Sequence, residues 1–273
     1  MDVKDMLNQL DYLYNMGDLK EAETRLTKWL EQALNTRNYG AALTFYNEME
    51  GLYRTTGRAK QAADISDKAL ALIEQIGLTG TVHHATTLLN GATANRWAQN
   101  FDKALDMYQQ AAEIFRNLDL KNSYLMASVY NNISHIYQQQ NKHEKALQNL
   151  KTALGLVKDM DDSNSEIATT KVAMALSYMA LEDMETAKEY LDAAIAYYES
   201  DEGQTDGHYG SALSALGEYF WRKEKYESAI TTYEEALKFI RTRFGENDGC
   251  RVITQNLDII RNEMKTRQQK DNL

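Results

Sequence analysis

The residues of this chain whose types could support catalysis or metal binding are its histidines. His83 and His84 are adjacent in the tract GTVHHATT, and His135 and His143 lie in the tract NNISHIYQQQNKHEKALQNLKTAL. Imidazole is a common general acid or base and a common metal ligand. Adjacent side chains point to different faces of a helix, and no His or Glu follows His83 and His84 three or four residues later to complete a zinc site. We therefore predict no metal site at these histidines.

Other catalytic patterns are missing from the sequence. It contains no Gly-rich phosphate loop, no nucleophile elbow and no His-Glu-x-x-His helix. Paired carboxylates such as Asp161 with Asp162, or Glu234 with Glu235, are expected in turns or on helix surfaces, where charge is usually solvated. The single cysteine, Cys250, has no second thiol for a disulfide or a metal site, in keeping with a reducing compartment. We predict a protein that is not an enzyme and has no cofactor.

Charge and hydropathy limit the partners. The chain has 40 Asp and Glu against 30 Lys and Arg, a formal net charge of -10, which repels nucleic-acid phosphates and anionic lipid headgroups. No apolar run approaches the roughly 18 residues of a membrane span. The amino-terminal tract MDVKDMLNQLDYLYNMGD also lacks the basic and apolar regions of a signal peptide. We expect a soluble, cytoplasmic protein that binds neither nucleic acid nor membranes.

Helices are the elements that must position any functional residue. Tracts such as ALDMYQQAAEIFRNL and AKEYLDAAIAYYES place apolar residues at intervals of three and four, which is the period of an amphipathic helix. No alternating tract predicts a strand. Proline is absent and the 14 glycines are scattered, so no flexible linker divides the chain into separate domains.

Self-similarity shows how these helices are organised. An alanine that follows a short polar turn recurs at intervals of 40, 42, 42, 41 and 42 residues: Ala22, Ala62, Ala104, Ala146, Ala187 and Ala229. The residues seven positions later are Trp29, Ala69, Ala111, Ala153, Ala194 and Ala236. The residues nine positions earlier are mostly large: Leu13, Tyr53, Asn95, Tyr137, Tyr178 and Phe220. Small residues let two helices approach closely and large ones fill the space between them, so each segment predicts one helical hairpin.

These residue types and the 42-residue spacing resemble the tetratricopeptide repeat in the long form of kinesin light chains and quorum-sensing peptide receptors. The resemblance covers nearly the whole chain and implies an all-α protein, a right-handed α-α superhelix of stacked hairpins. Six repeats are expected, at residues 2–36, 37–78, 79–120, 121–161, 162–203 and 204–245. The tract FGENDGCRVITQNL is similar to the opening of a further repeat and predicts a capping helix over residues 247–270. Together these would form a single solenoid over residues 1–273.

Helix starts agree with this register. The unpaired amides of a first helical turn are often capped by Ser, Thr, Asp or Asn, with an acid three residues later. Three pairs have this spacing: Asp18 with Glu21, Asn141 with Glu144, and Ser163 with Glu166. We predict that each pair begins a helix. His143 falls at the register position of Phe101 and Tyr226, so we assign it to packing.

In a helical solenoid, binding residues are expected on the concave wall, which the first helix of each hairpin lines. The positions predicted to face this wall contain one polar cluster: Asn47, Arg54, Asn90, Arg96, Asn131, Asn132, His135 and Gln138. Amide side chains carry a donor and an acceptor, which suits them to hold an extended peptide backbone. The resemblance implies this role for Asn90 and Asn132, which match asparagines of the peptide-binding families. The alternative is that the cluster consists of ordinary solvated residues.

The charged and apolar parts of the predicted wall suggest what a ligand would carry. Arg54 and Arg96 could pair with carboxylates of an acidic segment. Farther along the chain the wall becomes more apolar and could accept large ligand side chains. The residues concerned are Val172, Leu176, Met179 and Trp221.

The leading hypothesis is a non-enzymatic interaction module that binds a peptide or an extended segment of a partner protein. A second hypothesis is the sensor part of a peptide-responsive switch. Because Leu10 and Leu13 already fit the first repeat, we expect that such a switch would act through a partner protein. A third is self-association into a homo-oligomer through end helices or exposed aromatic residues such as Trp97 and Trp221. Solution scattering with and without ligand separates the first two hypotheses, and molar mass by light scattering tests the third.

Overall fold

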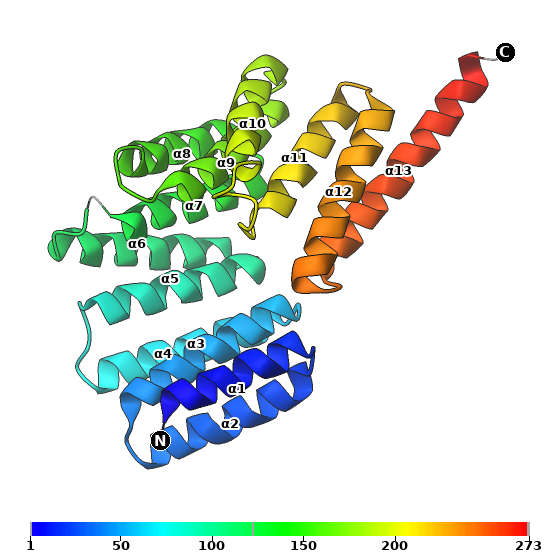
Figure 1. The fold of residues 1–273 in the computed structure, drawn as a ribbon. Helices are drawn as coiled ribbons and strands as arrows, with labels where there is room; N and C mark the ends of the chain where they lie inside the picture. The colour runs from blue at the N-terminus through cyan, green and yellow to red at the C-terminus, as the bar shows by residue number, and fades with distance from the viewer. Residues whose placement is uncertain (1, 122, 272–273) are drawn as a thin grey trace. The chain divides into compact units, whose positions relative to one another are not determined.

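The structure is a computed structural model that describes residues 2–121 and 123–271. In this part of the chain it contains thirteen helices and no strand (Figure 1), so the predicted all-α class is confirmed. The helices are α1 Val3–Asn15, α2 Leu19–Asn35, α3 Tyr39–Thr55, α4 Ala59–Gln75, α5 Val82–Trp97, α6 Phe101–Asn117, α7 Tyr124–Gln139, α8 His143–Val157, α9 Asn164–Ala180, α10 Met184–Tyr198, α11 Tyr209–Arg222, α12 Tyr226–Phe244 and α13 Asp248–Asp271.

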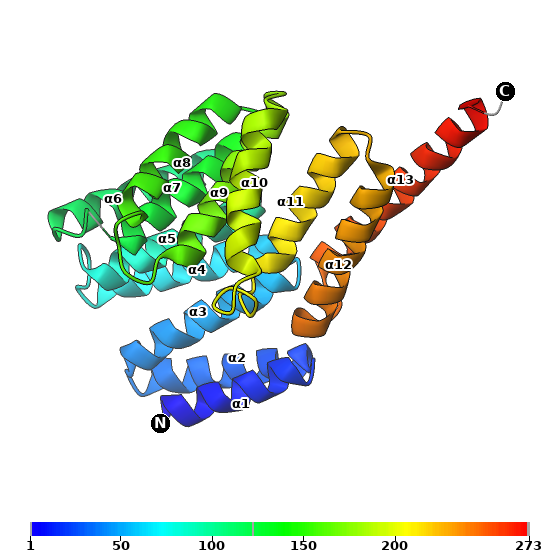
Figure 2. The ribbon, with the colours of Figure 1, turned by 45° about the horizontal axis from the view of Figure 1, so that its top comes forward.

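The chain divides into two compact units, residues 1–129 and 130–273, which are described separately. The first unit holds α1 to α6, the second holds α8 to α13, and α7 contains the boundary. Within the first unit α5 packs on α4 and α6, and within the second α9 packs on α8 and α10 (Figure 2). Each of the six helix pairs lies inside one of the predicted repeat ranges. The single continuous solenoid stays a prediction.

The alanine register is confirmed by burial. All six alanines that define it have no exposed surface: Ala22, Ala62, Ala104, Ala146, Ala187 and Ala229. Asn95 is the exception among the large residues nine positions earlier, yet it too is fully buried. Its Nδ2 donates to the carbonyl oxygen of Gly91 at 2.9 Å, and its Oδ1 accepts from Asn100 Nδ2 at 3.2 Å. A buried amide is tolerated when its donor and acceptor are both satisfied in this way.

Two predictions about helix starts are confirmed and one is wrong. Asp18 caps α2, because its Oδ1 accepts from the backbone amide of Glu21 at 3.1 Å. Asn141 does not cap α8; it has φ 56° and the cap position falls to Lys142. Ser163 is the N-cap residue of α9, as predicted, although its hydroxyl donates to the carbonyl oxygens of Val157 and Met160 at 2.7 and 2.8 Å and not to the first turn of the helix.

The reason for the error at Asn141 is a second regular position in every hairpin turn. The residue five before each alanine has positive φ: Gly17, Gly57, Gln99, Asn141, Glu182 and Glu224. The amide of the next residue then donates to the carbonyl of the residue nine before the alanine, as from Lys142 to Tyr137 at 2.8 Å. This is a left-handed helix stop of the Schellman type. Asn141 therefore ends α7 and cannot begin α8.

No helix in the described residues is both long enough and apolar enough to cross a membrane.

Candidate ligand-binding surface

In the first unit, the predicted binding residues lie on α3 and α5, the first helices of two hairpins. Asn90 on α5 donates through Nδ2 to Asn47 Oδ1 on α3 at 3.3 Å. Asn47 is exposed and Asn90 is half-buried. Within residues 2–121 and 123–271, Asn47 Nδ2 and Asn90 Oδ1 have no hydrogen-bond partner. The pair thus offers one donor and one acceptor next to each other at the surface.

Open space lies beside this amide pair. Asn47, Gly51 and Arg54 follow one another at helical intervals of four and three, so they share a face of α3. A Cβ atom added at Gly51 would meet nothing within 4 Å. A ligand can therefore approach the α3 backbone closely between Asn47 and Arg54. We call the surface made by Asn47, Gly51, Arg54, Asn90 and Arg96 the first-unit wall.

Two arginines occupy the end of the first-unit wall. Arg96 is half-buried, its Nε has no hydrogen-bond partner, and its guanidinium carbon lies 5.0 Å from the ring centroid of Trp97. Burial lowers the pKa of Arg96, a hydrogen bond to Tyr108 opposes this, and the charge of Arg54 lowers it further. Neither Arg54 nor Arg96 forms an ion pair with any residue that the structure describes. Two positive charges are thus close together without carboxylate partners.

The neighbouring part of the first helices is acidic. Burial raises the pKa of Tyr14 to about 12, and the charges of Glu48 and Asp11 add to the effect. Burial and Asp11 also raise the pKa of Glu48. The first helices of this unit therefore carry a negative region on α1 and α3 and a positive region on α3 and α5.

In the second unit, two of the predicted amides are already used inside the protein. Asn131 Nδ2 donates to Thr170 Oγ1 on α9 at 3.0 Å, and the Thr170 hydroxyl lies 3.2 Å from Asn131 Oδ1. Gln138 Nε2 donates to the carbonyl oxygen of Ala173 and to Ser177 Oγ, both at 2.8 Å. Gln138 Oε1 lies 3.0 Å from His135 Nδ1. These side chains connect α7 to α9, a role that spacing along α7 did not predict.

Gln138→Ala is expected to lower the free energy of unfolding by about 2 kcal/mol, because two buried acceptors on α9 lose their donor. Denaturant unfolding followed by circular dichroism measures this. The matched control is Gln139→Ala on the exposed side of the same helix, where a change within about 0.5 kcal/mol is expected. Equal losses in the two variants would contradict the role assigned to Gln138.

A serine, an aspartate and a histidine also meet in the second unit, but not as a catalytic triad. Ser165 donates to Asp206 Oδ2 at 2.5 Å, and His208 Nδ1 lies 2.9 Å from Asp206 Oδ1. Asp206 lies between the other two residues, so Ser165 bonds to the aspartate and not, as a catalytic triad would require, to the histidine. Hydrogen bonds from Ser165 and His208 lower the pKa of Asp206 despite its partial burial, which opposes them. The cluster fastens the loop after α10 to the start of α9.

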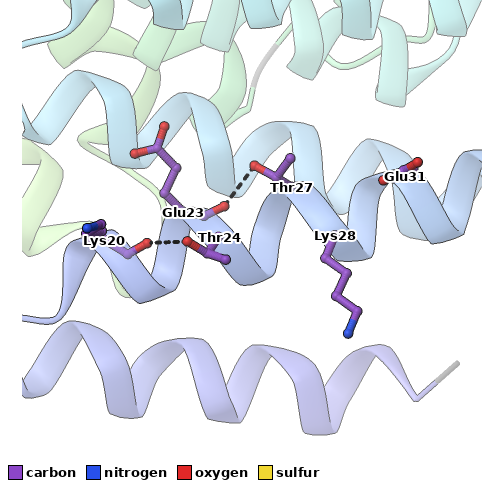
Figure 3. A pocket seen from close by; sticks show the side chains of 6 residues that line it. All are labelled: Lys20, Glu23, Thr24, Thr27, Lys28 and Glu31. Atoms are coloured by element: carbon purple, nitrogen blue, oxygen red, sulfur yellow. Dashed lines mark hydrogen bonds between the residues drawn. The ribbon is translucent and has the colours of Figure 1, made fainter.

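A hollow of about 500 Å³ lies elsewhere, along α2 (Figure 3). It is lined by Lys20, Glu23, Thr24, Thr27, Lys28 and Glu31. Both threonine hydroxyls donate to carbonyl oxygens one turn earlier, at 2.9 Å each. Glu23 is held by Arg58 at 2.8 Å. All six lining residues belong to one second helix, so the hollow lies apart from the first-unit wall. Among the described residues no three His, Cys, Asp or Glu side chains gather to hold a metal ion.

Comparison with known proteins decides the family. The sequence pattern of the tetratricopeptide repeat family matches residues 83–159 and 166–242, which is more than half of the chain. The chain belongs to the tetratricopeptide repeat family. No curated protein matches this tetratricopeptide repeat protein in sequence.

Solved structures share the tetratricopeptide repeat fold at low sequence identity. BtubC (BKLC) from P. vanneervenii is 20% identical with a TM-score of 0.65, covering 84% of this chain and 93% of its own. NprR in complex with its cognate peptide NprX is 17% identical with a TM-score of 0.66, covering 94% of this chain and 78% of its own. The apo form of RapI is 13% identical with a TM-score of 0.61, covering 97% of this chain and 100% of its own. At these identities the likeness shows the fold.

Proposed function

We propose that this tetratricopeptide repeat protein is a cytoplasmic, non-enzymatic module that binds an extended segment of a partner protein or a peptide. The observation that carries the proposal is the Asn47–Asn90 pair, with an open amide donor and an open carbonyl acceptor beside the bare backbone at Gly51. NprR, which has a similar fold, was solved with its cognate peptide, and this supports the proposal as an analogy.

An extended peptide fits these groups better than a compact ligand does. Each residue of an extended chain presents one backbone N–H and one C=O, and paired amide side chains can bind both. In the first-unit wall, the Asn47–Asn90 pair would hold the backbone while Arg54 and Arg96 contact ligand side chains. In the second unit, Asn132 and His135 on α7 would also contact the ligand, and Asn131 and Gln138 would support α7 through their bonds to α9.

Gly51→Leu is expected to weaken binding at least about tenfold, because the new side chain fills the open space where the ligand backbone would lie. The matched control is Gly155→Leu on α8, where an added Cβ also meets nothing within 4 Å. Ligands come from a screen of random peptides of about eight residues against the intact chain, and affinities from titration calorimetry. Equal affinity of the wild type and Gly51→Leu for every peptide found would contradict the location.

The amide pair provides a second test of the same surface. Asn90→Ala removes a donor and an acceptor and is expected to weaken binding about fivefold to fiftyfold. Arg116→Ala, an exposed side chain on α6, serves as the control. If the protein acts as a sensor, ligand would also change its dimensions in solution scattering. Unchanged dimensions would leave the binding module as the function and refute the sensor.

A further inference from the structure

Glu50 has a carboxyl group at a buried position where the other repeats have a small or apolar residue. The residues twelve before the register alanines are Leu10, Glu50, Ala92, Ser134, Ala175 and Gly217, and every one of them is buried. Glu50 is 4% exposed and accepts a hydrogen bond from Ser66 Oγ at 2.7 Å. Burial raises the pKa of Glu50 to about 7, while the Ser66 hydrogen bond and Arg54 partly oppose the rise. A carboxyl in such a place costs free energy when it ionises.

Glu50 is connected to the arginines of the first-unit wall. Arg54 follows it by four residues on α3, which places the two side chains on neighbouring turns. The charge of Arg54 in turn lowers the pKa of Arg96 on α5 and the pKa of Tyr108 on α6. Burial raises the pKa of Tyr108, so its hydroxyl stays neutral. From α4 the group that faces Glu50 is the neutral Ser66, and on α5 Gly91 presents only backbone towards Ser66. Arg54 is the charged residue whose field lowers the pKa of Glu50, against the effect of burial.

We propose that Arg54 and Arg96 form a subsite for one carboxylate of the bound segment, and that ionisation of Glu50 weakens this subsite. The inference rests on the proposed function and names the chemistry of its ligand. When Glu50 is neutral, two guanidinium groups without carboxylate partners attract an anion. When Glu50 ionises, its charge offsets that of Arg54 and repels the ligand carboxylate. Binding of an acidic segment and protonation of Glu50 therefore favour each other.

The sign of the pH effect follows from these charges. Below pH 7 Glu50 is mostly protonated and the subsite has its full positive charge. As the pH rises through this value the affinity for an acidic segment falls. A ligand that has an amide in place of the carboxylate shows little change, because it has no charge for Glu50 to repel.

The test uses two pools of peptides, each peptide about eight residues long. The sequences are random except at one central position and contain no histidine. One pool has Asp or Glu at that position and the other has Asn or Gln. Binding to the intact protein is measured at about pH 6 and about pH 8. At the lower pH the acidic pool is expected to bind about tenfold more tightly than the amide pool. At the higher pH this preference is expected to fall threefold to tenfold, roughly.

Three variants separate the parts of the proposal. Arg54→Gln and Arg96→Gln are each expected to abolish the preference for the acidic pool, whereas the control Arg116→Gln on α6 keeps it. Glu50→Gln is expected to hold the preference constant between the two pH values. Equal binding of both pools by the wild type, or a pH effect that persists in Glu50→Gln, would overturn the subsite. If neither pool binds, or if Gly51→Leu leaves both pools bound, the proposed function itself fails and the subsite fails with it.

Discussion

Glu50→Gln is expected to raise the free energy of unfolding at about pH 8 by about 3 kcal/mol and to leave it nearly unchanged at about pH 4. The carboxyl has its pKa raised from 4.5 to about 7 by burial in the folded protein. A difference of this size corresponds to about 1.4 kcal/mol for each pH unit. Glutamine keeps an oxygen that can accept from the Ser66 hydroxyl, and it never has to ionise. The variant therefore gains stability wherever the native carboxyl is charged.

The sign follows from proton linkage. The folded state binds the Glu50 proton more tightly than the unfolded state does, so the stability of the wild type falls as the pH rises from about 4.5 to about 7 and then levels. Denaturant unfolding at several pH values measures the slope. The matched control is Glu113→Gln on the exposed side of α6, which should keep the wild-type slope. A wild-type slope that survives in Glu50→Gln would show that another group is responsible.

Because the chain has two compact units, the global unfolding curve can contain two transitions. Amide hydrogen exchange resolves which unit responds. Slower exchange is expected in α3 and α4, which contain Glu50 and Ser66. No change is expected in α12. Equal slowing in both units would contradict a local origin of the effect.

The packing register was predictable from sequence because it depends on residue size alone. A residue at a close approach of two helices must be small, so the six buried alanines mark these approaches without any knowledge of the partner residues. The prediction that Asn141 caps α8 was wrong, because Asn141 belongs to the end of α7. Asparagine suits both a helix cap and a left-handed residue, and only the bond from Lys142 to Tyr137 decides between the two.

The candidate site was harder to predict from sequence. The spacing of residues shows which face of a helix a side chain lies on, but it does not show which residues of a neighbouring helix that side chain contacts. Asn131 has the register position of Asn47, and Gln138 has that of Arg54 and Arg96. Their amides nevertheless bond to Thr170 and Ala173 on α9. Whether an amide side chain can bind a ligand or already bonds to a neighbouring helix depends on the distances between the helices. Glu50 was not predicted as a functional residue for a different reason, because it occupies a buried packing position and not a position that faces the wall. A charged residue at a register position that is otherwise small or apolar is a signal that sequence alone contains.

Gly217→Ala is expected to lower the free energy of unfolding by about 1 to 3 kcal/mol, although alanine is the better helix former. A Cβ atom at Gly217 would lie 2.9 to 3.0 Å from three ring carbons of Tyr233, whose side chain is only 2% exposed. The ring must shift within a packed interior, and this costs more than the helix gains. Gly51→Ala is the matched control, because its Cβ would meet nothing within 4 Å. That variant is expected to gain about 0.5 to 1 kcal/mol.

The cost at Gly217 should depend on the size of its partner. Gly217 stands twelve before a register alanine and Tyr233 four after it, and in the preceding repeat the same positions hold Ala175 and Leu191. A small residue at one position thus leaves room for a larger one at the other. Tyr233→Leu is accordingly expected to remove most of the extra cost of Gly217→Ala in a double-mutant cycle of denaturant unfolding, since the double variant recreates the alanine–leucine pair. Additive losses in the cycle would mean that the two positions do not compensate each other in size.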